Sequence, residues 1–230
     1  MVATCGPRRG LGETSTEAST VTRVQQREAT RQRIVDCAVE VLISRGLAAV
    51  TTAGVQREAG VSRGALLHHF PTRQEMLGAT IAGLMTRNEA AAGEATAALA
   101  PYGAARAADP VTRAMQVLQA TVVRPAFGAE LELWAAARTD PALREVLRRE
   151  ERLARADLYR TVANVFGPEL TARPRYRVAA SLTVQFLRGL AISEVLRAEQ
   201  NATDRLIEEW AAVVRSVLSD EPGTTNRRRP

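Results

Sequence analysis

Apolar residues recur along most of the chain at spacings of three and four, the period of an amphipathic α-helix. A first helix is predicted over Arg23–Arg45, with one apolar face at Ile34, Ala38, Val41 and Leu42. The alternation of apolar and polar residues that is typical of strands is nearly absent. The pattern therefore predicts an all-α fold.

Capping residues, glycine and proline divide the remainder into further helices. Thr51 opens a short second helix that ends at Gly60, Ser62 opens a third that ends near Phe70, and Thr72 opens a long fourth. Asp-Pro pairs at 109–110 and 140–141 are typical of an N-cap followed by proline at the first helical position. We expect about nine helices and no strand, the last five at 110–123, 125–139, 141–166, 174–198 and 203–219.

The two ends of the chain lack this periodicity. Residues 1–22 are rich in Gly, Thr, Ser and Arg and are predicted to form a disordered leader. Residues 220–230, which end in three arginines and a proline, are predicted to form a flexible tail.

The second and third helices flank a tight turn at Ala59-Gly60-Val61. Ser62 stands where an N-cap is needed, and the helix behind it carries Arg63, His68 and His69. Two short helices joined in this way are typical of a helix-turn-helix whose second helix enters a DNA major groove. The segment therefore predicts DNA binding.

The exposed positions of this motif suggest individual roles. Arg63 is the preferred reader of a base, since its guanidinium can contact O6 and N7 of guanine together, with a phosphate contact as the alternative. Thr51 and Arg73 lie at helix N-termini, where an anion is favoured, and are assigned to phosphate. The full set of candidate DNA contacts is Thr51, Gln56, Ser62, Arg63, Gly64, Ala65, Leu67, His68, His69 and Arg73.

His68 and His69 are adjacent, so their side chains point about 100° apart on a helix and cannot chelate one ion well. We expect no metal site and no cofactor. His69 is expected to contact phosphate or to fix the helix end, and His68 to meet DNA. The sequence shows no nucleophile with a base and no glycine-rich phosphate loop, so an enzyme is not expected.

The placement of charge agrees with DNA binding. All 31 basic residues are arginine, which a GC-rich genome also favours. Residues 1–73 carry a net charge of +4, residues 74–226 carry −1, and the three arginines of the tail supply the rest. Positive charge therefore gathers around the predicted helix-turn-helix, where it favours binding to phosphates.

Two cysteines, Cys5 and Cys37, are too few for a disulfide framework. No apolar segment has the length of a membrane span, and the leader lacks the apolar core of a signal peptide. We therefore expect a cytoplasmic protein that does not enter the membrane.

The last two predicted helices are apolar on more than one side. One stripe can face the core of the subunit, and a second would leave an exposed apolar patch unless a partner covers it. A homodimer joined through a four-helix bundle is the simplest interpretation, with full burial in a thick monomer as the alternative. The predicted interface residues are Leu182, Phe186, Leu190, Leu206, Trp210, Val213 and Val217.

The stretch from Arg33 to Leu77 resembles the tetracycline-repressor (TetR) family of bacterial transcription regulators. The matching residues are Ala38, Gly46, Thr51, Val55, Ala59-Gly60-Val61-Ser62, Gly64, His69-Phe70, Arg73 and Leu77. The resemblance implies a DNA-binding head at 23–72 and a helical ligand-binding and dimerisation domain at 73–219. It also implies a homodimer that binds a palindromic operator in double-stranded DNA.

Two positions depart from the family pattern. Leu67 stands where the family usually has a tyrosine, so it is expected to meet a thymine methyl group or to pack inside. Gln56 replaces a usual small residue and is expected at a phosphate or at the rim of the interface.

The larger side chains of the second domain suggest an apolar cavity for a small-molecule effector. The candidates are Met115, Phe127, Trp134, Tyr159, Phe166 and Phe186, with Arg124, Glu130 and Arg138 as possible polar anchors. A repressor released by an apolar or amphipathic effector is the preferred function. The alternative is an architectural DNA-binding protein that responds to no ligand, and the sequence does not give the effector, the operator or the sign of control.

Overall fold

The computed structural model describes residues 13–106, 109–122, 124–194 and 200–219. Within these ranges the chain is helical and contains no strand, which confirms the all-α prediction. The helices are α1 Glu13–Arg45, η1 Leu47–Ala49 (a 3-10 turn), α2 Thr52–Ala59, α3 Arg63–His69, α4 Arg73–Arg106, α5 Pro110–Val122, α6 Pro125–Ala137, α7 Pro141–Phe166, α8 Pro168–Thr171, α9 Tyr176–Glu194 and α10 Gln200–Ser219. None of them combines the length and apolarity that crossing a membrane requires.

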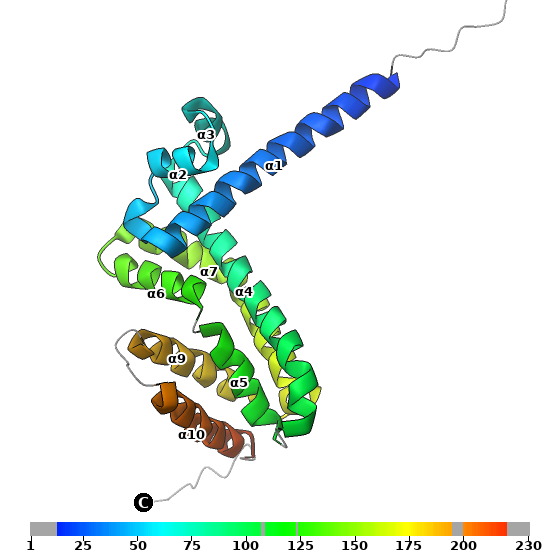
Figure 1. Ribbon diagram of the computed structural model, residues 1–230, viewed down its shortest axis with the longest axis vertical. Coiled ribbons are helices and arrows are strands. Elements are labelled where there is room, and N and C mark those ends of the chain that lie inside the picture. The colour runs from blue at the N-terminus through cyan, green and yellow to red at the C-terminus, as the bar shows by residue number, and fades with distance from the viewer. Residues whose placement is uncertain (1–12, 107–108, 123, 195–199, 220–230) are drawn as a thin grey trace, which may run out of the picture.

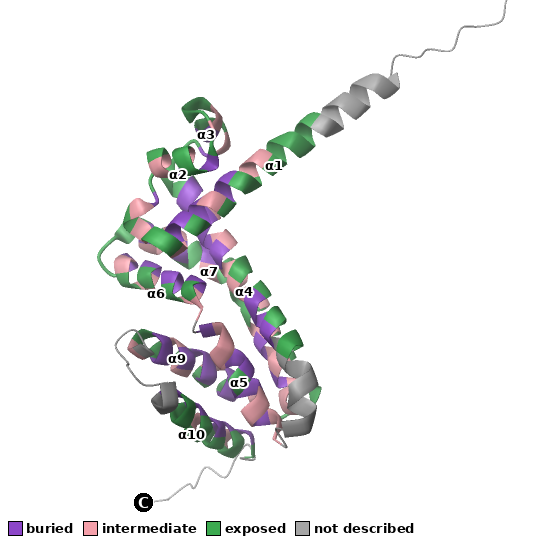
Figure 2. Cartoon of the chain, viewed as in Figure 1, coloured by how far each residue is buried: buried purple, intermediate pink, exposed green. Residues whose placement is uncertain are grey.

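The first helix begins ten residues earlier than predicted. It starts at Glu13, so the disordered leader predicted for 1–22 is wrong over 13–22, and residues 1–12 lie outside the described part of the chain, as does the predicted tail at 220–230. The physical reason is that no glycine or proline occurs between Gly12 and Gly46 to end the helix. Figures 1 and 2 show the N-terminal part of α1 projecting from the body, and residues 23–29 are exposed on every side.

Proline marks the start of four helices, as the sequence predicts for three of them. Pro110, Pro125, Pro141 and Pro168 are each the first helical residue. The fourth of these helices, α8, is a single turn between α7 and α9, and it brings the count above the expected nine. The side chain of Asp140 accepts a hydrogen bond from the N–H of Leu143 at 3.0 Å, which caps α7.

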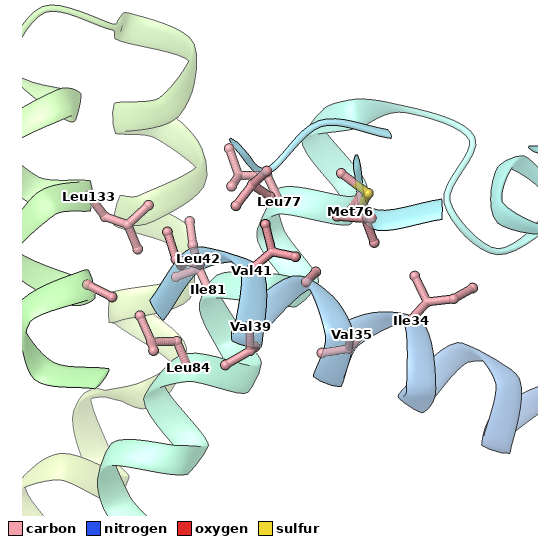
Figure 3. Packing of buried hydrophobic residues seen from close by; sticks show 14 of the residues in the cluster. Ile34, Val35, Val39, Val41, Leu42, Met76, Leu77, Ile81, Leu84 and Leu133 are labelled. Carbon is pink, nitrogen blue, oxygen red and sulfur yellow. The ribbon is translucent and has the colours of Figure 1, made fainter. Parts of the chain in front are cut away.

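The first hydrophobic core joins the N-terminal helices to part of the body. Ile34, Val41 and Leu42 of α1 pack with Ile81 and neighbouring residues of α4 (Figure 3). The same core contains Leu133 of α6 and Leu143 and Leu147 of α7. The N-terminal helices therefore share their core with three helices beyond residue 72, namely α4, α6 and α7.

Gly83 allows α1 and α4 to pack closely. A Cβ atom at this position would lie 2.9 Å from Cγ1 of Val35 and 3.1 Å from Cγ2 of Val39, both in α1. Any larger residue would force the helices apart. An ion pair between Arg87 of α4 and Glu40 of α1 adds a polar contact across the same junction.

A second core joins α5, the C-terminal end of α7, α9 and α10. Met115, Phe166, Leu187 and Val214 are among its buried members. The indole N–H of Trp210 in α10 donates to the hydroxyl of Thr183 in α9 at 3.1 Å. In Figure 1 this bundle lies at the opposite end of the molecule from α2 and α3, and α4 and α7 run between the two ends.

Candidate nucleic-acid interface and ligand cavity

The turn between α2 and α3 is set by glycine. Gly60 has φ 63° and ψ 32°, the left-handed conformation that glycine adopts without strain. Its N–H donates to the carbonyl of Arg57, and the N–H of Val61 donates to that of Gln56, both at 3.3 Å. These bonds end α2 and redirect the chain into α3.

Side-chain caps fix the start of each helix in the motif. Thr51 accepts from the N–H of Gly54 at 3.0 Å, and Ser62 accepts from that of Ala65 at 3.1 Å. Thr72 accepts from the N–H of Glu75 and donates to its carboxylate, both at 3.1 Å, so the Thr72 hydroxyl caps α4. The hydroxyl groups of Thr51 and Ser62 are therefore engaged in capping before any DNA contact.

The third helix presents one polar face and one buried face. Leu66 is buried in the first core, whereas Arg63, Gly64, Leu67 and His68 are exposed. Ala65 and Gln56 are partly buried, and Arg73 is exposed at the first residue of α4. The predicted DNA contacts are thus gathered on α2, α3 and the start of α4, at one end of the molecule (Figure 1).

Leu67 does not pack inside, because 40% of its surface is exposed. Of the two roles expected for it, contact with a thymine methyl group is the one that this position allows.

His69 is partly buried. Burial lowers its pKa, and the nearby positive charges of Arg27 and Arg31, together with His68, lower it further. The shift favours the neutral ring, which donates one hydrogen bond and accepts another.

A cavity of about 390 Å³ lies between α4, α5, α6, α7 and α9. Helix α7 supplies a continuous stripe to its wall at Glu151, Ala154, Arg155, Leu158 and Val162, positions that share one helical face. Helix α4 contributes Met85, Thr86, Asn88 and Glu89, among others. The walls combine apolar side chains with charged groups.

Only part of the predicted aromatic lining reaches this cavity. Phe127 and Tyr159 line it, and Trp134 lines a neighbouring hollow that also touches Glu151. Met115, Phe166 and Phe186 do not line it: Met115 is fully buried in the second core, Phe166 packs edge-on against Tyr176, and Phe186 stacks on Trp210 at a centroid distance of 4.5 Å. Met115 and Phe166 are buried in the second core and Phe186 is partly buried against it, as is common for large apolar side chains.

Of the three predicted polar anchors, only one lines this cavity. Glu130 lines the cavity, where it pairs with Arg188 at 3.5 Å and accepts from Asn88 at 2.8 Å. Arg138 lines the neighbouring hollow, and Arg124 pairs at 3.0 Å with Glu94. Arg188 was not among the predicted anchors, although its position within an otherwise apolar segment is a usable signal.

Helices α9 and α10 leave apolar side chains exposed, and bands of buried and exposed residues lie along both (Figure 2). Leu182 and Val213 are each 44% exposed, and Leu206 is 37% exposed. Phe186, Trp210 and Val217 are partly buried. Leu190 is different, because it is only 5% exposed and belongs to the second core, so its side chain is not available to a partner at this face.

Comparison with known proteins identifies the family. A model of the bacterial regulatory proteins of the tetR family matches residues 34–80. The HTH-type transcriptional regulator BetI of Ectopseudomonas mendocina is 32% identical over 180 residues, which cover 74% of this chain and 86% of that protein. The chain belongs to the tetR family of bacterial transcription regulators, and its helix-turn-helix is a DNA-binding motif.

Solved structures share the fold over nearly their whole length. A TetR-family regulator from a Rhodococcus species has a TM-score of 0.57 at 20% identity and covers 83% of this chain and 98% of its own. The multidrug binding protein EbrR in complex with proflavin has a TM-score of 0.52 at 25% identity, with 82% and 99% covered. The departures at Leu67 and Gln56 thus occur within a shared architecture.

Proposed function

We propose that this regulator is a homodimeric repressor that binds a palindromic operator and is released by a small-molecule effector. The observation that carries the proposal is the course of α4. This helix begins at Arg73, beside the DNA-binding motif, and Met85, Asn88 and Glu89 further along it line the cavity. A single helix therefore connects the two sites.

The coupling follows from the geometry of DNA. In a two-fold dimer the two recognition helices must lie about 34–36 Å apart to enter successive major grooves. An effector that binds better when α4 is displaced would favour a spacing that fits DNA poorly. Loss of operator binding is the expected consequence.

Two further observations support the proposal. The exposed apolar side chains of α9 and α10 suit a four-helix interface between two subunits, as in an isologous dimer. EbrR, which shares the fold, is described as a multidrug binding protein and has been crystallised with proflavin. Because the target is chromosomal DNA, we place the protein in the cytoplasm, and we infer no catalytic activity.

Selection of binding sites from random double-stranded DNA tests the proposal. A palindromic consensus is expected, followed by loss of binding to that consensus when an effector is added. An architectural DNA-binding protein would instead select no consensus and would keep its affinity in the presence of every compound tested.

A further inference from the structure

The charged side chains that line the cavity are mostly acidic. Five carboxylates face two guanidinium groups, which gives the lining a formal charge of −3; the groups are Glu89, Glu130, Glu150, Glu151, Asp157, Arg155 and Arg188. A cleft lined mainly by one sign of charge concentrates ions of the opposite sign. The lining therefore favours a positive ligand over a negative one.

Arg188 is the more deeply placed of the two arginines, and its charge is already engaged. Its side chain is 17% exposed, it pairs with Glu130 at 3.5 Å, and its guanidinium carbon lies 4.0 Å from the centroid of the Trp134 ring. Asn88 donates to the other oxygen of Glu130 at 2.8 Å. Glu130 and Arg188 thus form a satisfied pair that adds little net charge.

Three more carboxylates have partners outside the cavity wall. Glu150 accepts from Arg149 at 2.7 Å. Arg160 pairs with both Glu89, at 3.6 Å, and Asp157. Arg149 and Arg160 do not line the cavity themselves, and counting both reduces the formal charge around it from −3 to −1.

Glu151 differs from the other four acids. Its Oε1 atom is buried and has no hydrogen-bond partner among the described residues. Burial raises the pKa of this carboxyl group, Arg188 lowers it, and the negative charge of Glu130 raises it again. The neighbouring indole N–H of Trp134, which is itself buried without a hydrogen-bond partner among the described residues, lowers the pKa. Arg155, one turn further along α7, also attracts it. Because an unsatisfied buried acceptor destabilises the protein, a ligand that supplies a positive charge and a donor there would be stabilised in return.

We propose that the effector is an organic cation with an apolar body, whose positive charge pairs with Glu151 while its body packs against Phe127 and Tyr159. This proposal rests on the effector-responsive function proposed above. The two aromatic side chains line the same cavity, and aromatic faces stabilise a neighbouring cation as well as apolar groups. The cavity volume of about 390 Å³ is that of a site for a small molecule.

Three compounds of one shape test the sign of the charge. Benzylammonium, ethylbenzene and phenylmethanesulfonate share a benzyl group and carry a positive head with N–H donors, a neutral head and a negative head. Binding to the full-length protein is measured by isothermal titration and by the shift in Tm. The cation is expected to bind at least about tenfold more tightly than the neutral compound, and the sulfonate more weakly than both. Equal or tighter binding of either of the other two, or no binding of the cation at millimolar concentration, overturns the proposal.

Glu151→Gln tests the residue. It removes the charge but keeps the shape, and it is expected to weaken binding of the cation about tenfold to a hundredfold while leaving the neutral compound unaffected. Glu145→Gln is the matched control, because Glu145 is an exposed acid on the same helix that does not line the cavity. An equal loss in both variants would show a long-range effect of charge and would overturn the assignment to Glu151.

Failure of this proposal can be told apart from failure of the regulator function. If an uncharged or anionic compound releases the selected operator and the cation does not, the cationic class is wrong and the effector-responsive repressor stands. If compounds of every charge leave operator binding unchanged, the proposed function as a repressor released by an effector is wrong as well.

Discussion

The carboxylate of Glu132 accepts a hydrogen bond from the backbone N–H of Leu47, with 2.8 Å between oxygen and nitrogen. Glu132 belongs to α6, two residues beyond Glu130 in the cavity wall, and Leu47 opens the 3-10 turn that leads into α2. The next residue of α6, Leu133, is buried in the core shared with α1 and α4. Helix α6 therefore provides a second connection between the cavity and the DNA-binding head.

Removal of this hydrogen bond should loosen that connection. Glu132→Ala is expected to lower the free energy of unfolding by about 1 kcal/mol, a typical net value for one hydrogen bond. It should also raise the effector concentration needed to release DNA. Urea unfolding and operator release measure the two effects. Glu132→Gln keeps an acceptor oxygen and should behave nearly as the wild type, so an equal defect in both variants would contradict this role.

Arg63 and Arg73, two exposed arginines predicted to contact DNA, should affect binding in different ways. Arg63→Ala should relax preference at one base pair, with a loss of about 1–3 kcal/mol of discrimination. Arg73→Ala should weaken binding to all sequences and reduce the salt dependence by about one unit of slope. Fluorescence anisotropy on operator and random DNA at several salt concentrations separates these results. Arg205→Ala, an exposed arginine of α10, serves as the charge control.

The cap at Ser62 should contribute to stability as well as to DNA binding. Ser62→Ala removes the acceptor for the N–H of Ala65 and is expected to cost about 1 kcal/mol in the free energy of unfolding. Ser62→Thr keeps a hydroxyl group at the cap and should retain most of that stability. Chemical denaturation of the two variants provides the measurement, and an alanine variant as stable as the threonine variant would argue against the cap.

Glu151 should destabilise the ligand-free protein at neutral pH. Its pKa in the folded protein is raised above the ordinary value of 4.5, so its ionised form is disfavoured by folding. The contribution of this carboxyl group to the free energy of unfolding is complete below pH 4.5. That contribution is lost as the pH rises through the raised pKa. Glu151→Gln should therefore have a higher Tm than the wild type at pH 7.5, and the difference should vanish near pH 4. A lower Tm of the variant at pH 7.5, with Glu145→Gln unchanged, would contradict this sign.

The exposed face of α9 and α10 should be required for the dimer. Val213→Asp places a charge where burial by a second subunit is expected, and it should raise the dimer dissociation constant at least about tenfold. Val24→Asp introduces the same charge on the exposed part of α1 and is the control. Sedimentation velocity across a concentration series compares them. An unchanged dimer in Val213→Asp would place the interface elsewhere.

The helices were predictable from the sequence because their boundaries depend on local chemistry. The caps at Thr51, Ser62 and Asp140 and the turn at Gly60 involve residues within a few positions of one another. The start of α1 was missed because a polar composition suggests disorder even where no residue breaks a helix. Signals of this kind depend on residues that are close in the sequence, so they can be recognised without knowledge of the tertiary contacts.

The lining of the cavity was far less predictable, because five helices contribute to it. Size alone favoured Met115 and Phe166, and both are buried in the core. Glu151 stands within the run Arg148-Arg149-Glu150-Glu151-Arg152, which has the pattern of a solvated helix face. Only the packing of α7 against its neighbours turns one side of that run inward, and sequence periodicity does not determine such packing.

The core that α1 and α4 share with α6 and α7 bears on attempts to build chimeric regulators. A transplant cut near residue 72 would separate the α1 members of this core, Val41 and Leu42 among them, from Leu133, Leu143 and Leu147 in the same core. A recombinant protein that exchanges operator specificity should therefore carry these two body helices along with the head, or replace only the exposed positions of α3.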